Sequence, residues 1–453
     1  MTRYLHHVPI LLTFVLALTK IASYGQVASA GEYLITSVRV ISMEDEKISP
    51  EQHVLIRDGR IISIGTKKPA AAVVIDGKGN YLMPGLSEMH AHVPHVDDLA
   101  PMKDVMLLYA CNGITTIRGM LGHPLHLELR SKVASGEIIG PRLYTSGPSF
   151  SGLSVKTPKA GAELVRKQKA MGYDFLKLHP GLSRDKFRAI VATAKEVGIT
   201  YGGHVSFGVG LWEACSSGYA TIDHLDGMTE AMVPGIDTLT DQTAGLFGMF
   251  VGARADQRRI PEVMRALKEN RVSLVPTQTL AERWFAPDAT PERMDAAPEM
   301  IYMDRKTRDA WMQVKRNLMA NPRYRADDMN TYIMLRRRML KEAQHSGVTI
   351  LLGSDGPQVF NVPGFSVHHE LRALVNSGLT PYEALKTGTV NVAAFYQASD
   401  RGKVKPGYVA DLVLLGANPL ENISNTTTIE GVFLNGRWMS KSVIDNTLKS
   451  LVK

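Results

Sequence analysis

Short apolar segments rich in β-branched residues alternate with helix-like stretches through the centre of this sequence. Eight such segments occur between residues 84 and 400, and helix-like sequence follows each of them. They are 86–92, 114–118, 142–147, 174–179, 199–205, 220–225, 272–278 and 348–355. Eight consecutive βα units predict a (β/α)8 (TIM) barrel, an α/β fold with a closed parallel sheet.

The segments on either side of this region have a different pattern. Asp58-Gly59 and Asn435-Gly436 are hairpin turn signals between apolar runs. Strand-like segments are 33–41, 53–65, 72–82, 411–416 and 429–438. We therefore predict a small β-sandwich domain formed from residues 31–83 and 401–453, and a barrel domain at 84–400.

The central region is longer than the roughly 250 residues typical of such a barrel. The excess falls in two additions, at about 226–262 and 280–335. Long additions after barrel strands usually form lids or subunit contacts, so a homo-oligomer is among the expectations.

The first thirty residues have the pattern of a secretory signal peptide. Arg3, His6 and His7 precede an apolar run from Val8 to Leu18, which is too short to span a membrane, and small residues follow at Ala28-Ser29-Ala30. We expect cleavage after Ala30 and a periplasmic or secreted protein without stable membrane insertion. The alternative is an uncleaved anchor.

Charge and cysteine content exclude several classes of protein. The net charge is +8, from 52 basic and 44 acidic residues, but no basic run is longer than Arg336–Arg338. A nucleic-acid partner would need a concentrated basic stripe, so we expect none. Two cysteines, Cys111 and Cys215, exclude a disulfide scaffold and a Cys-rich zinc module. The sequence leaves open whether they pair.

Four histidines, one lysine and one aspartate occur at the ends of five predicted barrel strands. They are His90, His92, Lys177, His204, His224 and Asp355. Active sites of such barrels form at the carboxyl ends of the strands, so these side chains should converge. Imidazole nitrogens and carboxylate oxygens are the ligands that Zn²⁺ takes when thiolates are absent.

Two motifs then identify a resemblance to a known family. Met83-Pro-Gly-Leu-Ser-Glu-Met-His-Ala-His resembles the entry into the barrel in the metal-dependent amidohydrolase superfamily. Gly402-Lys-Val-Lys-Pro-Gly-Tyr-Val-Ala-Asp-Leu-Val-Leu-Leu resembles its return into the small domain. The lysine on the fourth strand is similar to the branch with imidazolonepropionase-like and Xaa-Pro-dipeptidase-like hydrolases.

The resemblance implies a role for each of the six residues. His90, His92 and Asp355 would hold a buried metal ion, and His204 and His224 a more exposed one. Lys177, carboxylated by CO₂, would bridge these two divalent ions, for which Zn²⁺ is the first expectation. A hydroxide between them would be the nucleophile, and Asp355 would take up its proton and pass it to the leaving amine.

Other residues are weaker candidates. Arg118 ends the second strand and could hold a substrate carboxylate, but an internal Glu88–Arg118 pair is the alternative. His179 has the strand parity of Lys177, so it either reaches the substrate or supports a ligand. His368 and His369 open a helix, where capping or packing is the expectation. Phe247, in the first addition, either walls a cavity or packs in a core.

Two classes of function remain open. The leading one is a secreted hydrolase with two metal ions that cleaves an amide bond in small peptides or N-acyl amino acids. On the same site, cyclic amides, lactones or carbamates are the alternative substrates. The other class is a catalytically inactive secreted binding protein.

Overall fold

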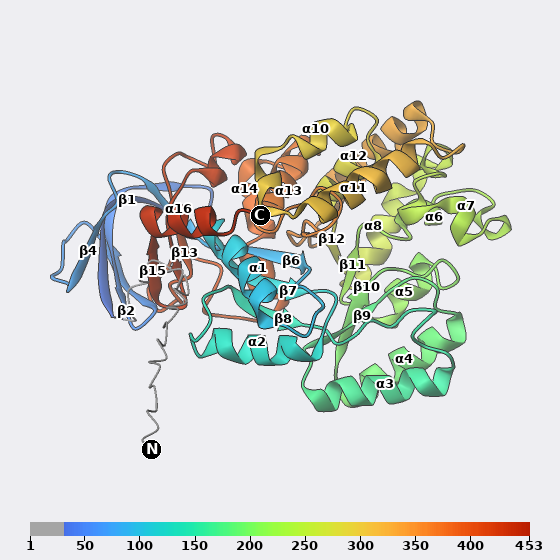
Figure 1. The fold of residues 1–453 in the computed structure, drawn as a ribbon, viewed down its shortest axis with the longest axis horizontal. Coiled ribbons are helices and arrows are strands. Elements are labelled where there is room, and N and C mark those ends of the chain that lie inside the picture. The colour runs from blue at the N-terminus through green and yellow to red at the C-terminus, as the bar shows by residue number, and fades with distance from the viewer. Residues whose placement is uncertain (1–30) are drawn as a thin grey trace, which may run out of the picture.

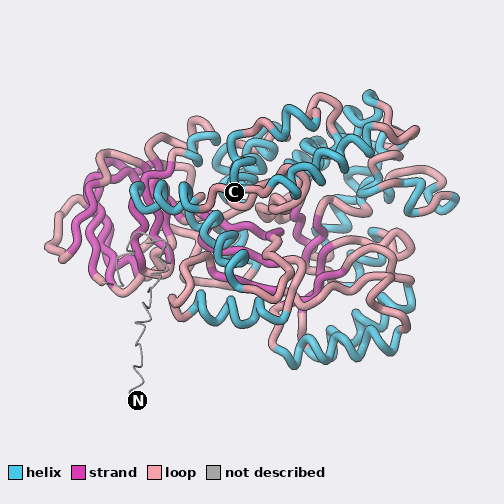
Figure 2. Tube along the Cα trace, in the orientation of Figure 1, coloured by secondary structure: helices cyan, strands magenta, loops and turns pink. Residues whose placement is uncertain are grey.

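The computed structural model describes residues 31–453; the predicted signal peptide lies outside these described residues. A barrel forms the centre of the molecule (Figure 1). A second sheet, built from a smaller part of the chain and called the smaller sheet below, lies at one end of the molecule. The strands gather in these two places, and helices surround the barrel (Figure 2).

The barrel strands are parallel and follow one another around the sheet. Their bounds are β6 (Leu86–Ala91), β7 (Ile114–Gly119), β8 (Arg142–Thr145), β9 (Phe175–Leu178), β10 (Thr200–Gly203), β11 (Thr221–Asp223) and β12 (Ser273–Val275). β6, β7 and β8 pair in order, and β9 to β12 form a second run. Bridges from Ser146 to Phe175 and from Phe150 to Leu178 join the two runs.

The eighth predicted segment closes the barrel, although it is not a regular strand. Leu351 donates its backbone N–H to Leu274 of β12 at 2.8 Å. On the other side, Met89 of β6 donates to Leu352 at 2.8 Å, and Asp355 donates to the carbonyl of His90 at 3.1 Å. The barrel predicted from eight βα units is therefore confirmed, with residues 348–355 between β12 and β6.

Helices surround the barrel sheet, and further helices form the additions. Around the barrel lie α1 (Leu99–Cys111), α2 (Pro124–Ala134), α3 (Pro158–Met171), α4 (Arg184–Val197), α5 (Leu211–Ser217), α8 (Ile260–Glu269), α12 (Ala326–Ser346), α13 (Phe365–Asn376), α14 (Pro381–Thr387) and α15 (Val390–Phe395). The additions contain the short helices α6 (Met228–Ala231) and α7 (Asp241–Ala244), and also α9 (Gln278–Phe285), α10 (Pro291–Asp295) and α11 (Arg305–Met319). α16 (Lys441–Ser450) lies near the C-terminus.

Residues from both ends of the described chain build the smaller sheet. Its strands are β1 (Glu32–Ile41), β2 (Ile48–Arg57), β3 (Arg60–Gly65), β4 (Val73–Asp76), β5 (Tyr81–Pro84), β13 (Leu412–Leu415), β14 (Ile429–Leu434) and β15 (Arg437–Ser440). The order is β15-β14-β13-β5-β1-β2-β3, with β4 also paired to β1. β13 from the C-terminal part thus pairs with β5 from the N-terminal part, which ties the two segments together.

One strand prediction for this sheet is wrong. We expected a single strand at 72–82, but a turn at Gly77–Gly79 splits it into β4 and β5. A Cβ on Gly77 would lie 2.5 Å from the carbonyl oxygen of Thr36, so the backbone approaches β1 closely here. β4 and β5 consequently pair with β1 one after the other.

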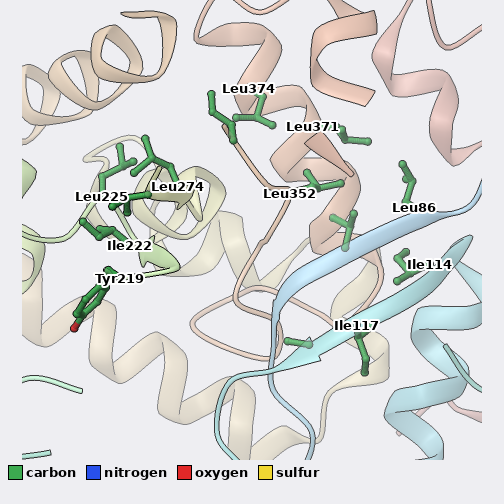
Figure 3. Packing of buried hydrophobic residues seen from close by; sticks show 14 of the residues in the cluster. Leu86, Ile114, Ile117, Tyr219, Ile222, Leu225, Leu274, Leu352, Leu371 and Leu374 are labelled. Atoms are coloured by element: carbon green, nitrogen blue, oxygen red, sulfur yellow. The ribbon is translucent and has the colours of Figure 1, made fainter. Parts of the chain in front are cut away.

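Apolar side chains from strands and helices form the core around the barrel. Leu86, Ile114 and Ile117 of β6 and β7 belong to the same buried group as Leu371 and Leu374 of α13 (Figure 3). A second buried group packs the additions together and includes Phe285, Met329 and Tyr332. Among the described residues, no helix is long and apolar enough to cross a membrane.

His368 fastens α13 to neighbouring segments from within the core. Its Nδ1 lies 2.9 Å from the hydroxyl of Thr426 and its Nε2 lies 3.1 Å from the carbonyl of Asn112. It is 2% exposed, and burial lowers its pKa to about 3. The expected packing role of His368 agrees with this placement.

We predict that His368 makes the folded protein less stable in acid. In the folded state its pKa is near 3, whereas an unfolded histidine titrates near 6.5, so only the unfolded chain gains a proton between these values. Stability should fall by up to about 1.4 kcal/mol per pH unit as the pH drops below 6.5. Urea unfolding at pH values from 8 to 5 gives the free energy of unfolding at each pH. This free energy should fall less steeply with decreasing pH in His368→Asn than in the wild type. The control His345→Asn, at an exposed position, should show the same pH dependence of the free energy of unfolding as the wild type. The same pH dependence in the wild type, His368→Asn and His345→Asn would contradict the prediction.

Candidate metal centre

Six polar side chains from five strand ends meet at the carboxyl end of the barrel. His90 lies on β6 and His92 directly follows it, Lys177 lies on β9, and His204 and His224 follow β10 and β11. Asp355 ends the eighth segment, beside His90. The ring centroids of His90 and His224 are 4.5 Å apart, and those of His204 and His224 are 4.6 Å apart. The structure thus brings the predicted histidines together.

His90, His92 and Asp355 form the tightest group. One ligand atom from each lies within 4.8 Å of the others. The closest pair is His92 Nε2 and Asp355 Oδ1, at 2.7 Å. This is a separation at which both atoms can bind one ion.

Unpartnered atoms show that these residues fit a metal ion. Asp355 Oδ1 and His224 Nε2 are buried and have no hydrogen-bond partner among the described residues. Asp355 Oδ1 lies near His92 Nε2 without the alignment of a hydrogen bond. Buried polar atoms without partners are costly, and nitrogen and carboxylate lone pairs are the donors that a divalent cation such as Zn²⁺ uses.

Neighbouring side chains orient His204 and His224. His204 Nδ1 lies 3.1 Å from Asp226 Oδ2, and His224 Nδ1 lies 2.8 Å from the hydroxyl of Thr277. Each contact occupies one ring nitrogen and leaves Nε2 for another partner. Such contacts fix the ring orientation of metal-binding histidines.

The backbone at two of the strand ends is strained. His224 has φ 64° and Asp355 has φ 66°, in the left-handed region that residues with a Cβ rarely adopt. Strain of this kind gathers at functional sites, where the surrounding structure holds it. Here it turns both side chains toward the centre.

His90, His204 and His224 are neutral at physiological pH. Burial lowers the pKa of His204 to about 3, and burial also keeps the pKa of His90 and His224 well below the usual 6.5. A metal ligand must be the neutral imidazole, so these rings need lose no proton to bind an ion at pH 7.

Asp223 connects the buried charges below the histidines. Its Oδ2 lies 2.9 Å from His90 Nδ1 and 3.5 Å from Lys177 Nζ, and its Oδ1 accepts a hydrogen bond from Arg118 at 3.2 Å. Asp223 and Lys177 are both 0% exposed. Burial raises the pKa of Asp223, but Arg118 and Lys177 outweigh it and lower the pKa overall, so this side chain is a carboxylate.

Both roles that we considered for Arg118 disagree with this arrangement. Arg118 is 3% exposed and donates to the carbonyl of Met89, to Thr221 and to Asp223. Its guanidinium therefore faces Asp223 inside the barrel, not a substrate cavity. The Glu88–Arg118 pair is also wrong, because the partners of Glu88 are elsewhere.

Glu88 instead joins the first strand end to the eighth segment. Its carboxyl group accepts the backbone N–H of His90 at 2.8 Å and that of Ser354 at 2.9 Å, and it also bonds the Ser354 hydroxyl. Burial raises the pKa of Glu88 to about 8. Glu88 thus holds His90 and the residue before Asp355 in fixed positions.

An aromatic side chain from the first addition covers two of the histidines. Phe247 stacks on His224 with a centroid distance of 4.6 Å and an interplanar angle of 12°, and on His204 at 5.8 Å. Its backbone carbonyl accepts a hydrogen bond from the Tyr332 hydroxyl at 2.8 Å. On the sequence alone, Phe247 was a cavity wall or a core residue; here it is a core residue, 5% exposed in the buried group that packs the additions, and it also covers His204 and His224.

His179 lies beside the same group. Its ring stacks on His204 with a centroid distance of 4.9 Å, and burial lowers its pKa to about 2. His179 is only half-buried. A role in contact with the substrate stays a prediction for this residue.

Comparison with known proteins decides the family. The amidohydrolase family model matches residues 81–439. The chain belongs to the amidohydrolase family. Members of this family are hydrolases that act on carbon–nitrogen bonds, so the expected class of enzyme is confirmed.

Individual relatives of this amidohydrolase are distant but cover most of it. Ochratoxinase of Aspergillus niger is 23% identical over 409 residues, which cover 76% of this chain and 71% of the relative. Imidazolonepropionase of Kosmotoga olearia is 23% identical over 407 residues, covering 87% and 92%. A crystal structure of a Xaa-Pro dipeptidase with bound methionine has a TM-score of 0.66 at 18% identity, covering 90% of this chain and 100% of that one.

We predict that Arg118→Met mainly destabilises this amidohydrolase. The substitution leaves the Asp223 carboxylate buried without its guanidinium partner, which typically costs about 3–5 kcal/mol. Denaturant unfolding measures the loss. The conservative variant Arg118→Lys should lose less stability, because it keeps a positive charge beside Asp223. Unchanged stability together with a raised KM would contradict the structural role.

Proposed function

We propose that this protein hydrolyses an amide bond of small peptides or N-acyl amino acids with the help of two divalent metal ions. The observation that carries the proposal is the cluster of ligand atoms of His90, His92 and Asp355, with the unpartnered Asp355 Oδ1 and His224 Nε2, at the mouth of an amidohydrolase barrel. The names of its relatives, a Xaa-Pro dipeptidase among them, support an amide substrate.

Two sets of residues would hold the ions. His90, His92 and Asp355 would bind one ion, and His204 and His224 the other. Lys177, once carboxylated, would contribute an oxygen to each, because a carbamate has two anionic oxygens and an ammonium has none. When bound, such a pair supplies an activated water and polarises the scissile carbonyl.

The protein's own residues would position the substrate and move the proton. Asp355 Oδ1 lies at the centre of the site, where it can take up a proton and return it to the leaving amine. Phe247 closes the side above His204 and His224, so the substrate would approach along His92 and His179. Arg118 takes no part, because it is paired to Asp223 inside the barrel.

A hydrolysis screen against dipeptides, N-acyl amino acids, cyclic amides and lactones tests the proposal. We expect turnover of linear amides by metal-loaded protein and none by His92→Ala. Turnover of lactones or cyclic amides alone would contradict the substrate class, and metal binding without any turnover would indicate a binding protein.

We also propose export directed by residues 1–30. N-terminal sequencing of the mature protein tests it: a mature N-terminus at Gly31 supports export, and a mature protein that retains Arg3 contradicts it.

We predict that Lys177→Ala loses most activity and at least one metal ion per chain. The bridging oxygens disappear with the side chain, and a short carboxylic acid added in solution should restore part of both. Metal analysis and activity assays measure these effects. Lys315→Ala is a matched control, because Lys315 is also 0% exposed but binds the carbonyls of Trp284 and Ala286 away from the site. Full metal content in Lys177→Ala would contradict the bridge.

We predict that Asp355→Asn lowers kcat while it keeps most of the metal. The amide retains an oxygen ligand but cannot act as a base, and general-base catalysis contributes about 10²–10⁴-fold in rate. Steady-state kinetics on the best substrate of the screen, with metal analysis of the same sample, check this. If kcat were unchanged, the base would be another group, and His179→Asn would be the next variant to measure.

A further inference from the structure

A polar cavity lies at the opposite end of the barrel from the metal centre. It has a volume of about 40 Å³ and is lined by Ser87, Thr116 and Arg142, which lie near the starts of β6, β7 and β8. Asp411 and Arg401, from the segment that returns to the smaller sheet, complete it. The cavity therefore lies at the joint between the barrel and the smaller sheet.

Three buried hydrogen-bond donors in this cavity lack a partner. Arg142 Nε, Arg401 Nε and the Tyr396 hydroxyl line it and have no hydrogen-bond partner within residues 31–453. Native proteins leave few such groups unpaired, and those that remain usually face bound water or an ion. Three of them in one small cavity point to an occupant that accepts hydrogen bonds.

The charges around the cavity favour an anion. Asp411 is the one carboxylate among the lining residues, and one of its oxygens already accepts the backbone N–H of Asn435 at 3.1 Å. Asp400 lies 3.5 Å from Arg401 but is bonded to Arg60 at 2.9 Å. Among the residues that line the cavity, two arginines, Arg142 and Arg401, thus face one carboxylate, Asp411, which leaves one positive charge in excess. Water could satisfy the donors but not this charge.

We propose that the cavity binds a small oxoanion, such as phosphate or formate, between the two arginines and Tyr396. A guanidinium donates to oxoanions through a planar set of N–H groups, which matches oxygens better than a spherical ion. The volume exceeds the roughly 10–15 Å³ that one water molecule needs, so an anion of several atoms can enter. The anion would link barrel strands to the segment that enters the smaller sheet, at a site separate from the reaction.

Calorimetric titration with phosphate and with formate tests this, with sodium chloride at equal ionic strength as the blank. We expect saturable binding of at least one oxoanion and a rise of a few degrees in Tm at a hundredfold excess over Kd. Arg142→Gln and Arg401→Gln should weaken binding at least tenfold, and Tyr396→Phe about 2- to 10-fold. Arg254→Gln, which removes one exposed arginine elsewhere, is the matched control and should bind like the wild type.

Two further controls keep the result interpretable. An oxoanion could also bind at the metal centre, so His92→Ala is titrated in parallel and should retain the cavity binding. If Arg142→Gln does not fold, Arg401→Gln and Tyr396→Phe carry the comparison. No saturable binding, or equal affinity in the wild type and all cavity variants, overturns the proposal.

Discussion

The buried carboxylate of Asp223 is the interaction on which the rest of the site depends. It lies between the guanidinium of Arg118 and the amine of Lys177, and its second oxygen approaches His90. Without it, two cationic side chains would be enclosed together at the centre of a barrel, where removing one charge partner is strongly destabilising. The carboxylate thereby allows a lysine to lie fully buried beside the proposed metal ligands.

Two further contacts fix the positions of the site residues around Asp223. Glu88 binds backbone N–H groups of both His90 and Ser354, so the first and eighth parts of the barrel keep one spacing. Phe247 stacks on His224 and is held through its carbonyl by Tyr332, so the first addition is fastened over the site. The position of His224, a proposed metal ligand, therefore depends on how the additions pack.

The barrel and the convergence of the six strand-end residues could be predicted from the sequence, because parallel strands place their carboxyl ends at one edge. We did not predict Asp223 as a site residue, because side chains alternate along a strand and those of Asp223 and His224 should therefore point to opposite faces. The left-handed backbone at His224 breaks this alternation, and both side chains turn inward. The partner of Arg118 was mistaken because Asp223 is 105 residues away in sequence. Phe247 could not be placed because its position comes from the packing of additions, which no periodicity encodes.

The central claim is that two metal ions lie among these six residues. Anomalous diffraction at the metal absorption edge, from crystals of the purified protein, tests it most directly. The account predicts two peaks, one in contact with His90, His92 and Asp355 and one with His204 and His224, with density for a carbamate on Lys177 between them. A single peak with an unmodified Lys177 still paired to Asp223, or peaks away from these residues, would contradict it.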